Sequence, residues 1–146
     1  MGKASRAIIV EGDKLLVMYR DKSGSQYATL VGGRVNEGES LDQALVREVK
    51  EETGLEVKSS RLVFIEEHKP PYNEQYIYLV ELAPHDAAAI QATSEEGLIN
   101  RIGINLHEPR WVEKDAFGRL SFRTPQLQQA IIDSLHSGFP EQPKKL

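Results

Sequence analysis

One stretch of the chain carries the clearest structural signals: residues 33–55 read GRVNEGESLDQALVREVKEETGL. Ser40 followed three positions later by Gln43 is the capping-box pattern that opens a helix, and Gly54 is a typical residue just past a helix end. The sequence therefore predicts a helix from Leu41 to Thr53. With about 3.6 residues per turn, one side of this helix is apolar and carries Leu41, Ala44, Leu45 and Val49.

Three glutamates interrupt this apolar side in the last two turns. Glu48 and Glu52 fall almost directly above Leu41 and Leu45, and Glu51 lies beside them. Like charges at this spacing repel one another, and the carboxyl end of a helix disfavours anions. Clustered carboxylate oxygens are natural ligands for Mg²⁺ or Mn²⁺, whereas a solvated acidic face is the ordinary alternative. Repulsion also predicts that the metal-free protein becomes slightly more stable when one of the three charges is removed.

Outward from this helix, short predicted strands are separated by turn and loop signals. The predicted strands cover residues 7–10, 14–19, 29–31, 57–67, 75–82 and 110–112, and a second helix is predicted from Pro125 to His136. Residues 21–26 and 83–105 are interpreted mainly as loops. Strands mixed with two helices favour an α/β fold in which helices pack on the faces of a sheet. We expect one domain over residues 1–138 and a mobile tail over residues 139–146.

Composition excludes several classes of site. The chain has 146 residues, a net charge of −4 and no cysteine, so disulfides, zinc–thiolate sites and a cysteine nucleophile are excluded. The negative charge argues against binding a nucleic acid polymer through a broad basic face. The apolar run at residues 7–10 is too short for a signal peptide, and no stretch has the length of a membrane span. We therefore expect a cytoplasmic protein with no membrane partner.

The segment that includes the acidic helix resembles the Nudix box, whose pattern is G-x5-E-x7-R-E-U-x-E-E-x-G-U with U aliphatic. Every fixed position is filled, by Gly33, Glu39, Arg47, Glu48, Val49, Glu51, Glu52, Gly54 and Leu55. The box covers 23 of the 146 residues, and the element order of the rest agrees with the α/β/α sandwich of that family, a mixed sheet with helices on its faces. One departure is Val31, because many members have proline before the two glycines.

The resemblance implies roles for residues in and around the box. The metal ligands for Mg²⁺ or Mn²⁺ would be the Gly32 carbonyl and the carboxylates of Glu48, Glu51 and Glu52. Gly33, Glu39 and Gly54 would support the box, and Arg47 would orient the glutamates through charge-assisted hydrogen bonds. The catalytic residues would be Glu48, Arg47 and Glu108. The identity of the general base stays open between Glu48, Glu95, Glu96 and Glu108, as does the number of metal ions.

The implied activity is hydrolysis of a pyrophosphate bond in a nucleoside diphosphate linked to another moiety, of the ADP-ribose or nucleotide-sugar type. The alternatives are a nucleoside triphosphate pyrophosphatase that clears modified nucleotides, and a non-catalytic regulatory domain that binds nucleotides. Candidate substrate contacts are Arg34, Tyr27 and Tyr72. Some Nudix subfamilies have a marker residue shortly after the box that indicates the substrate. Here Pro70, Pro71 and Tyr72 fit the markers of two subfamilies, so they do not identify the substrate. The expected partner is a small nucleotide, and the sequence leaves a homodimer open.

Overall fold

The computed structural model of the chain describes residues 2–22, 24–68, 74–85 and 105–146. Its strands are β1 (Lys3–Glu11), β2 (Lys14–Lys22), β3 (Ser25–Thr29), β4 (Val31–Arg34), β5 (Val57–Glu67), β6 (Glu74–Leu82), β7 (Asn105–Glu113) and β8 (Lys144–Lys145). Its helices are α1 (Leu41–Thr53), α3 (Lys114–Phe117) and α4 (Pro125–Ser137). None of the helices in these ranges is long and apolar enough to cross a membrane.

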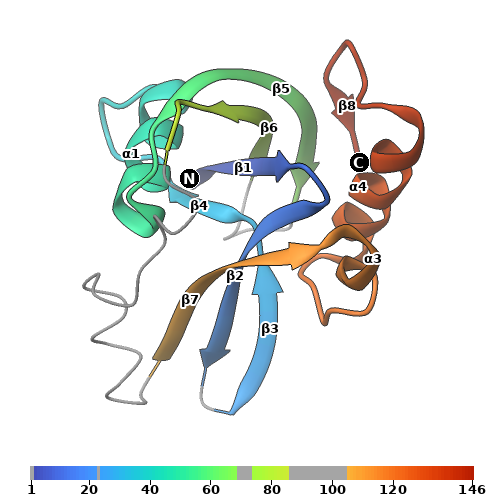
Figure 1. Cartoon of the computed structure of the whole chain (residues 1–146). Helices are drawn as coiled ribbons and strands as arrows, with labels where there is room; N and C mark the ends of the chain where they lie inside the picture. The colour runs from blue at the N-terminus through green and yellow to red at the C-terminus, as the bar shows by residue number, and fades with distance from the viewer. Residues whose placement is uncertain (1, 23, 69–73, 86–104) are drawn as a thin grey trace.

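The strands form one mixed sheet with a helix on each face (Figure 1). Its order is β3-β2-β1-β6-β5-β8, with β4 also paired to β1 and β7 also paired to β2. Side chains alternate between the faces of β1: Ala7 and Ile9 pack with Leu45 and Val49 of α1. Ile8 belongs to the cluster on the other face, which also contains Leu127 and Ile131 of α4. This is the predicted arrangement, with apolar faces of the sheet covered by the apolar stripes of helices.

The sheet divides into two halves beyond the β1–β2 turn. β1 and β2 pair only at Val10 with Leu15 and at Glu11 with Lys14. Away from the turn the two strands have different partners: β1 pairs with β4 and β6, while β2 pairs with β3 and β7. Figure 1 shows β2, β3 and β7 running away from β1, β4 and β6. A pocket has residues of both halves in its lining, including Gly32, whose amide contacts Glu52 in the last turn of α1.

The structure differs from the sequence prediction in several places. The predicted strand at 29–31 is instead the end of β3 and the start of β4, β1 begins at Lys3 rather than at residue 7, and the short helix α3 was not predicted. The predicted loop at residues 21–26 is instead the tip of the β2–β3 hairpin, where Asp21 pairs with Gln26. β7 runs from Asn105 to Glu113, so it is longer than the predicted strand at 110–112. Pro109 is accommodated because β7 pairs along only one side within the described chain. In the segment after residue 138, which we expect to be a mobile tail, β8 pairs with β5, and Phe139 and Leu146 pack against the α4-side core.

Candidate active site

Local capping determines where the acidic helix begins and ends. The Ser40 hydroxyl accepts a hydrogen bond from the Gln43 amide, and the Gln43 side chain accepts one from the Ser40 amide. Gly54 adopts φ of 77° at the other end, and its amide donates to the Lys50 carbonyl. The helix is also tied to the sheet, because the buried Ser5 hydroxyl donates to the Leu41 carbonyl at 2.8 Å. These contacts hold the three glutamates over β4.

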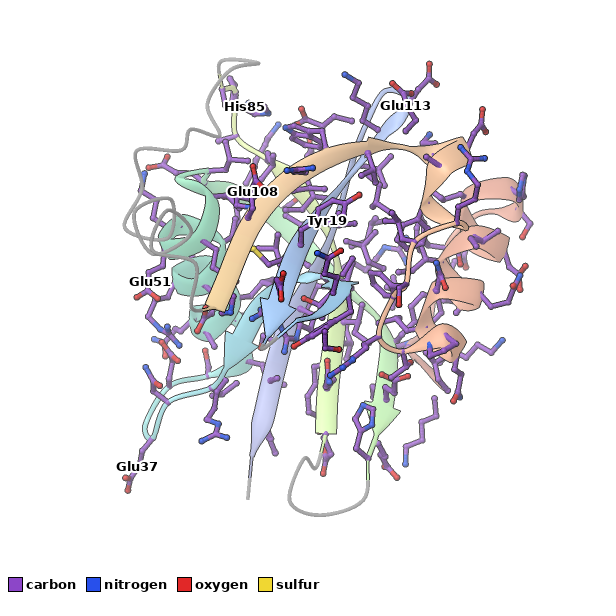
Figure 2. All side chains as sticks on the ribbon, turned by 90° about the horizontal axis from the view of Figure 1, so that it is seen from below. Tyr19, Glu37, Glu51, His85, Glu108 and Glu113 are labelled. Atoms are coloured by element: carbon purple, nitrogen blue, oxygen red, sulfur yellow. The ribbon has the colours of Figure 1, made fainter. Side chains whose placement is uncertain are left out.

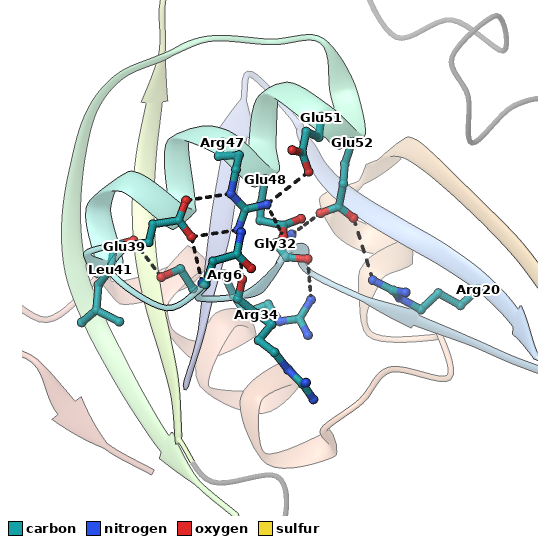
Figure 3. Close-up of polar contacts among 12 residues, drawn as sticks. Arg6, Arg20, Gly32, Arg34, Glu39, Leu41, Arg47, Glu48, Glu51 and Glu52 are labelled. Atoms are coloured by element: carbon teal, nitrogen blue, oxygen red, sulfur yellow. Dashed lines mark hydrogen bonds and ion pairs between the residues drawn. The ribbon is translucent and has the colours of Figure 1, made fainter. Parts of the chain in front are cut away.

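Arg47 contacts three carboxylates of the box with one guanidinium (Figure 3). Its Nε lies 2.7 Å from Glu39 Oε2, and its Nη1 lies 2.9 Å from Glu48 Oε1 and 3.2 Å from Glu51 Oε2. Its Nη2 donates to the Arg34 carbonyl at 3.0 Å. Chiefly because of the Arg47 hydrogen bond, the pKa of Glu39 is lowered to about 2. Arg47 therefore compensates the like charges that the helix pattern brings together.

The third glutamate, Glu52, is buried and occupies a different position. Its Oε1 accepts a hydrogen bond from the Gly32 amide at 2.7 Å, and its Oε2 lies 3.9 Å from Arg20 Nη2. The Gly32 carbonyl accepts a hydrogen bond from Arg6 Nη1 at 2.9 Å. Burial, and next the nearby charge of Arg20, lowers the pKa of Arg6. Glu52 is thus held between the strand backbone and a cationic side chain.

The donor groups suit a hard divalent cation, although arginines hold them in the present arrangement. The predicted ligands Gly32, Glu48, Glu51 and Glu52 offer oxygen atoms only, the preference of Mg²⁺ and Mn²⁺. Gly33 leaves room for Glu48, because a Cβ on Gly33 would lie 2.7 Å from the Glu48 carboxyl carbon. Among the described residues, no three acidic or histidine side chains converge on one point. The residues therefore fit such an ion in chemistry, and Glu48 and Glu51 each use only one carboxylate oxygen on Arg47.

A pocket of about 530 Å³ opens beside the glycines of β4. Its walls come from both halves of the divided sheet and from the segment before α4. The residues that line it are Arg6, Arg20, Tyr27, Thr29, Gly32, Gly33, His68, Gln75, Arg123 and Thr124. Three of these are arginines and none is acidic, so the pocket offers positive charge next to the acidic end of α1. Such a pocket suits an anionic ligand.

The sequence-predicted substrate contacts are only partly brought together. Tyr27 lines the pocket, where the Arg123 guanidinium lies 3.7 Å from its ring centroid. Arg34 lies at the end of β4, and its side chain is exposed and outside the pocket lining. Tyr72 lies outside the described residues, as do the alternative bases Glu95 and Glu96.

Glu108, predicted as a catalytic residue, is not brought to the acidic cluster. It pairs with Tyr19 across the β2–β7 ladder (Figure 2), and its carboxylate lies 2.7 Å from Arg110 Nη2. Tyr19 and Val112 both pack on the α4 side of the sheet. Alternation along β7 places Glu108 on the same side as Val112, away from α1. The neighbouring His107 faces the other way and lies 3.3 Å from Arg20, the arginine that contacts Glu52.

Sequence reasoning missed several pocket residues. Arg6 had a signal that could have been used, since it is the one charged residue between Lys3 and Glu11, the two ends of β1. His68, which directly follows the predicted strand at 57–67, lines the pocket and lies 3.1 Å from the buried Glu66. Arg123 had no signal, because its place depends on how residues 121–123 pair with β3.

Comparison with known proteins supports the interpretation of the box. A sequence profile described as the NUDIX domain matches residues 1–133. The NAD-capped RNA hydrolase NudC of Photobacterium profundum is 32% identical over 97 residues, which are 64% of this chain and 35% of that protein. The chain thus spans about a third of the length of this curated relative.

Solved structures share the fold across almost the whole chain. The E. coli ORF135 protein has a TM-score of 0.69 at 22% identity, covering 97% of this chain and 95% of its own. An ADP-ribose pyrophosphatase from Streptococcus suis 89-1591 has a TM-score of 0.68 at 20% identity, covering 99% and 98%. At such identities the likeness confirms the predicted fold alone. With the profile match, the predicted family is confirmed: the chain belongs to the NUDIX domain family.

Proposed function

We propose that the chain is a divalent-metal-dependent hydrolase that cleaves the pyrophosphate bond of a nucleoside diphosphate linked to another moiety, of the ADP-ribose or nucleotide-sugar type. One observation carries the proposal: the complete set of box glutamates at the end of α1 adjoins a pocket lined by three arginines. A pyrophosphate needs both features, because its negative charge must be neutralised before water can attack phosphorus. The solved ADP-ribose pyrophosphatase with the same fold is consistent with this substrate type.

In this proposal Glu48, Glu51, Glu52 and the Gly32 carbonyl hold the ion. When bound, a divalent cation polarises the P–O bonds and lowers the pKa of water. Arg47 positions Glu48 and Glu51, and Glu39 in turn fixes the Arg47 side chain through two hydrogen bonds. The Gly32 amide orients Glu52.

The proton of the attacking water needs an acceptor close to the acidic cluster. Among the described carboxylates we assign this role to Glu48, because it lies in the cluster and against Gly33 at the pocket edge. A carboxylate in hydrogen-bond reach of water is a competent general base. Glu95 and Glu96 remain alternatives outside the described residues, and Glu108 contacts Arg110 instead.

A second candidate is hydrolysis of nucleoside triphosphates. The arginine-lined pocket favours it, since a triphosphate carries more negative charge than a nucleotide sugar. A regulatory domain that binds without turnover is the candidate of another class, and the complete set of box glutamates argues against it.

A substrate screen on metal-stripped protein tests the proposal. ADP-ribose, UDP-glucose and nucleoside triphosphates are incubated with EDTA, with Mg²⁺ and with Mn²⁺, and the products are separated by chromatography. We expect no turnover in EDTA, recovery with either ion, and a nucleoside monophosphate among the products. Full turnover in EDTA, or a free nucleoside with intact pyrophosphate, contradicts the mechanism. Tight binding without turnover of any compound supports the regulatory domain instead.

A further inference from the structure

One arginine of the pocket differs from the other two in its contacts. Arg6 donates to the Gln75 side chain and to the Gly32 carbonyl, and Arg20 donates to Thr29 and lies near Glu52. Arg123 lies on the Tyr27 ring, at 3.7 Å from its centroid. Within the described chain, the Arg123 guanidinium has no hydrogen-bond or carboxylate partner. Its donors are therefore available to a ligand.

The backbone fixes Arg123 in this position. The Arg123 amide donates to the Ala28 carbonyl at 3.0 Å, and the Ala28 amide donates to the Ser121 carbonyl at 2.8 Å. Tyr27 precedes Ala28 on β3, and its ring packs against the Arg123 guanidinium. An arginine stacked in this way loses less freedom when it binds an anion than one that moves freely in solvent.

No carboxylate among the pocket-lining residues neutralises this charge. The buried Glu66 contacts two of the pocket-lining residues, His68 and Thr124. One of its oxygens lies 3.1 Å from His68 Nε2, and the other accepts a hydrogen bond from the Thr124 hydroxyl. Both carboxylate oxygens of Glu66 therefore have partners other than Arg123. The positive charge of Arg123 lines the pocket without a carboxylate partner among the pocket-lining residues.

We propose that Arg123, stacked on Tyr27, forms a subsite for a phosphate group of the substrate other than the diphosphate that is cleaved. The inference rests on the proposed function. Gly32 and Gly33 mark the catalytic side of the pocket, and Arg123 lines the same pocket from the segment before α4. A planar guanidinium matches a phosphate with two parallel hydrogen bonds. The chain thus prefers substrates with an additional phosphate, at the end of a polyphosphate chain or on a ribose.

The matched experiment uses two substrate pairs that differ by one phosphate. The first pair is ADP-ribose and ADP-ribose 2′-phosphate, and the second is ADP and ATP. We expect kcat/KM to be higher for the phosphorylated member of one pair by about tenfold, the effect of one charge-assisted contact. The pair that shows the preference identifies the source of the phosphate. In Arg123→Gln the ratio falls toward one, and in Arg123→Lys it falls only in part.

The control is Arg119→Gln, because Arg119 is exposed on the same connection and does not line the pocket. This variant keeps the wild-type ratio. A readout without catalysis is calorimetric binding of inorganic phosphate in EDTA, which weakens in Arg123→Gln and not in Arg119→Gln. Equal phosphate binding in both variants, or ratios near one in the wild type, overturns the subsite. If none of the compounds is turned over, the proposed function fails, while phosphate binding still tests Arg123.

Discussion

The buried carboxylate of Glu52 accepts a hydrogen bond from the Gly32 amide, 20 residues earlier in the chain, at 2.7 Å. This contact joins the last turn of α1 to β4 and to the edge of the pocket. It also changes an expectation from the sequence. Repulsion among three glutamates predicted that losing one charge would stabilise the metal-free protein, whereas Glu52 has an amide and an arginine as partners.

Glu52→Gln should therefore destabilise the metal-free protein, by about 1 kcal/mol, because a charge-assisted hydrogen bond becomes a neutral one. Urea denaturation with and without Mg²⁺ measures this change. Mg²⁺ should stabilise the wild type by ligand linkage and stabilise the variant less. Glu37→Gln is the control, since Glu37 is an exposed box residue outside the fixed pattern. A more stable metal-free variant with an unchanged Mg²⁺ effect would show that Glu52 behaves as a solvated surface charge.

The pair of Glu39 and Arg47 predicts a pH dependence at the acid limit. The pKa of Glu39 falls to about 2 from its ordinary value of 4.5, first through the Arg47 side chain and next through the Asn36 amide. A lowered folded-state pKa stabilises the fold above pH 4.5, and this stabilisation is lost as pH falls toward about 2. In Arg47→Met, a carboxyl NMR titration should move the Glu39 pKa back toward 4.5. An unshifted Glu39 in this variant, as expected for the exposed control Arg119→Met, would contradict the pairing.

Gly33→Ala should reduce activity far more than stability. A Cβ at this position would lie 2.7 Å from both the carboxyl carbon and Oε1 of Glu48, so the carboxylate must move. A displacement of about 1 Å in catalytic geometry costs on the order of 100-fold in rate, while overpacking costs about 1–3 kcal/mol. Gly118→Ala is the matched control, because its Cβ would meet only Ile132 Cδ1, at 3.4 Å. A comparable loss of kcat in both variants would contradict the inference that Gly33 is needed to leave room for the Glu48 carboxylate.

The parts of the fold that sequence predicted well are those determined by local contacts. Both ends of α1 were predicted to the residue, because Ser40, Gln43 and Gly54 make their capping contacts within a few positions. The pocket was not predicted, since it arises where β1 and β2 stop pairing and the sheet divides. That division is a tertiary feature with no periodic signal along the chain, so Arg6 and Arg123 were not brought into the site.

For Glu108, too, the role expected from the sequence differs from the position in the structure. The resemblance to the Nudix family implied that it could be the general base, but the structure pairs it with Arg110 on the side of β7 that faces away from α1. Glu108→Gln should keep kcat within about twofold, whereas loss of a true general base costs roughly 100- to 10,000-fold. Glu48→Gln should show the larger loss, and Glu113→Gln, an exposed change at the end of the same strand, should show none. Rate–pH profiles of the three variants measure this difference. A 100-fold loss in Glu108→Gln, together with disappearance of the acidic limb, would mean that β7 presents Glu108 to the substrate in a conformation other than this one.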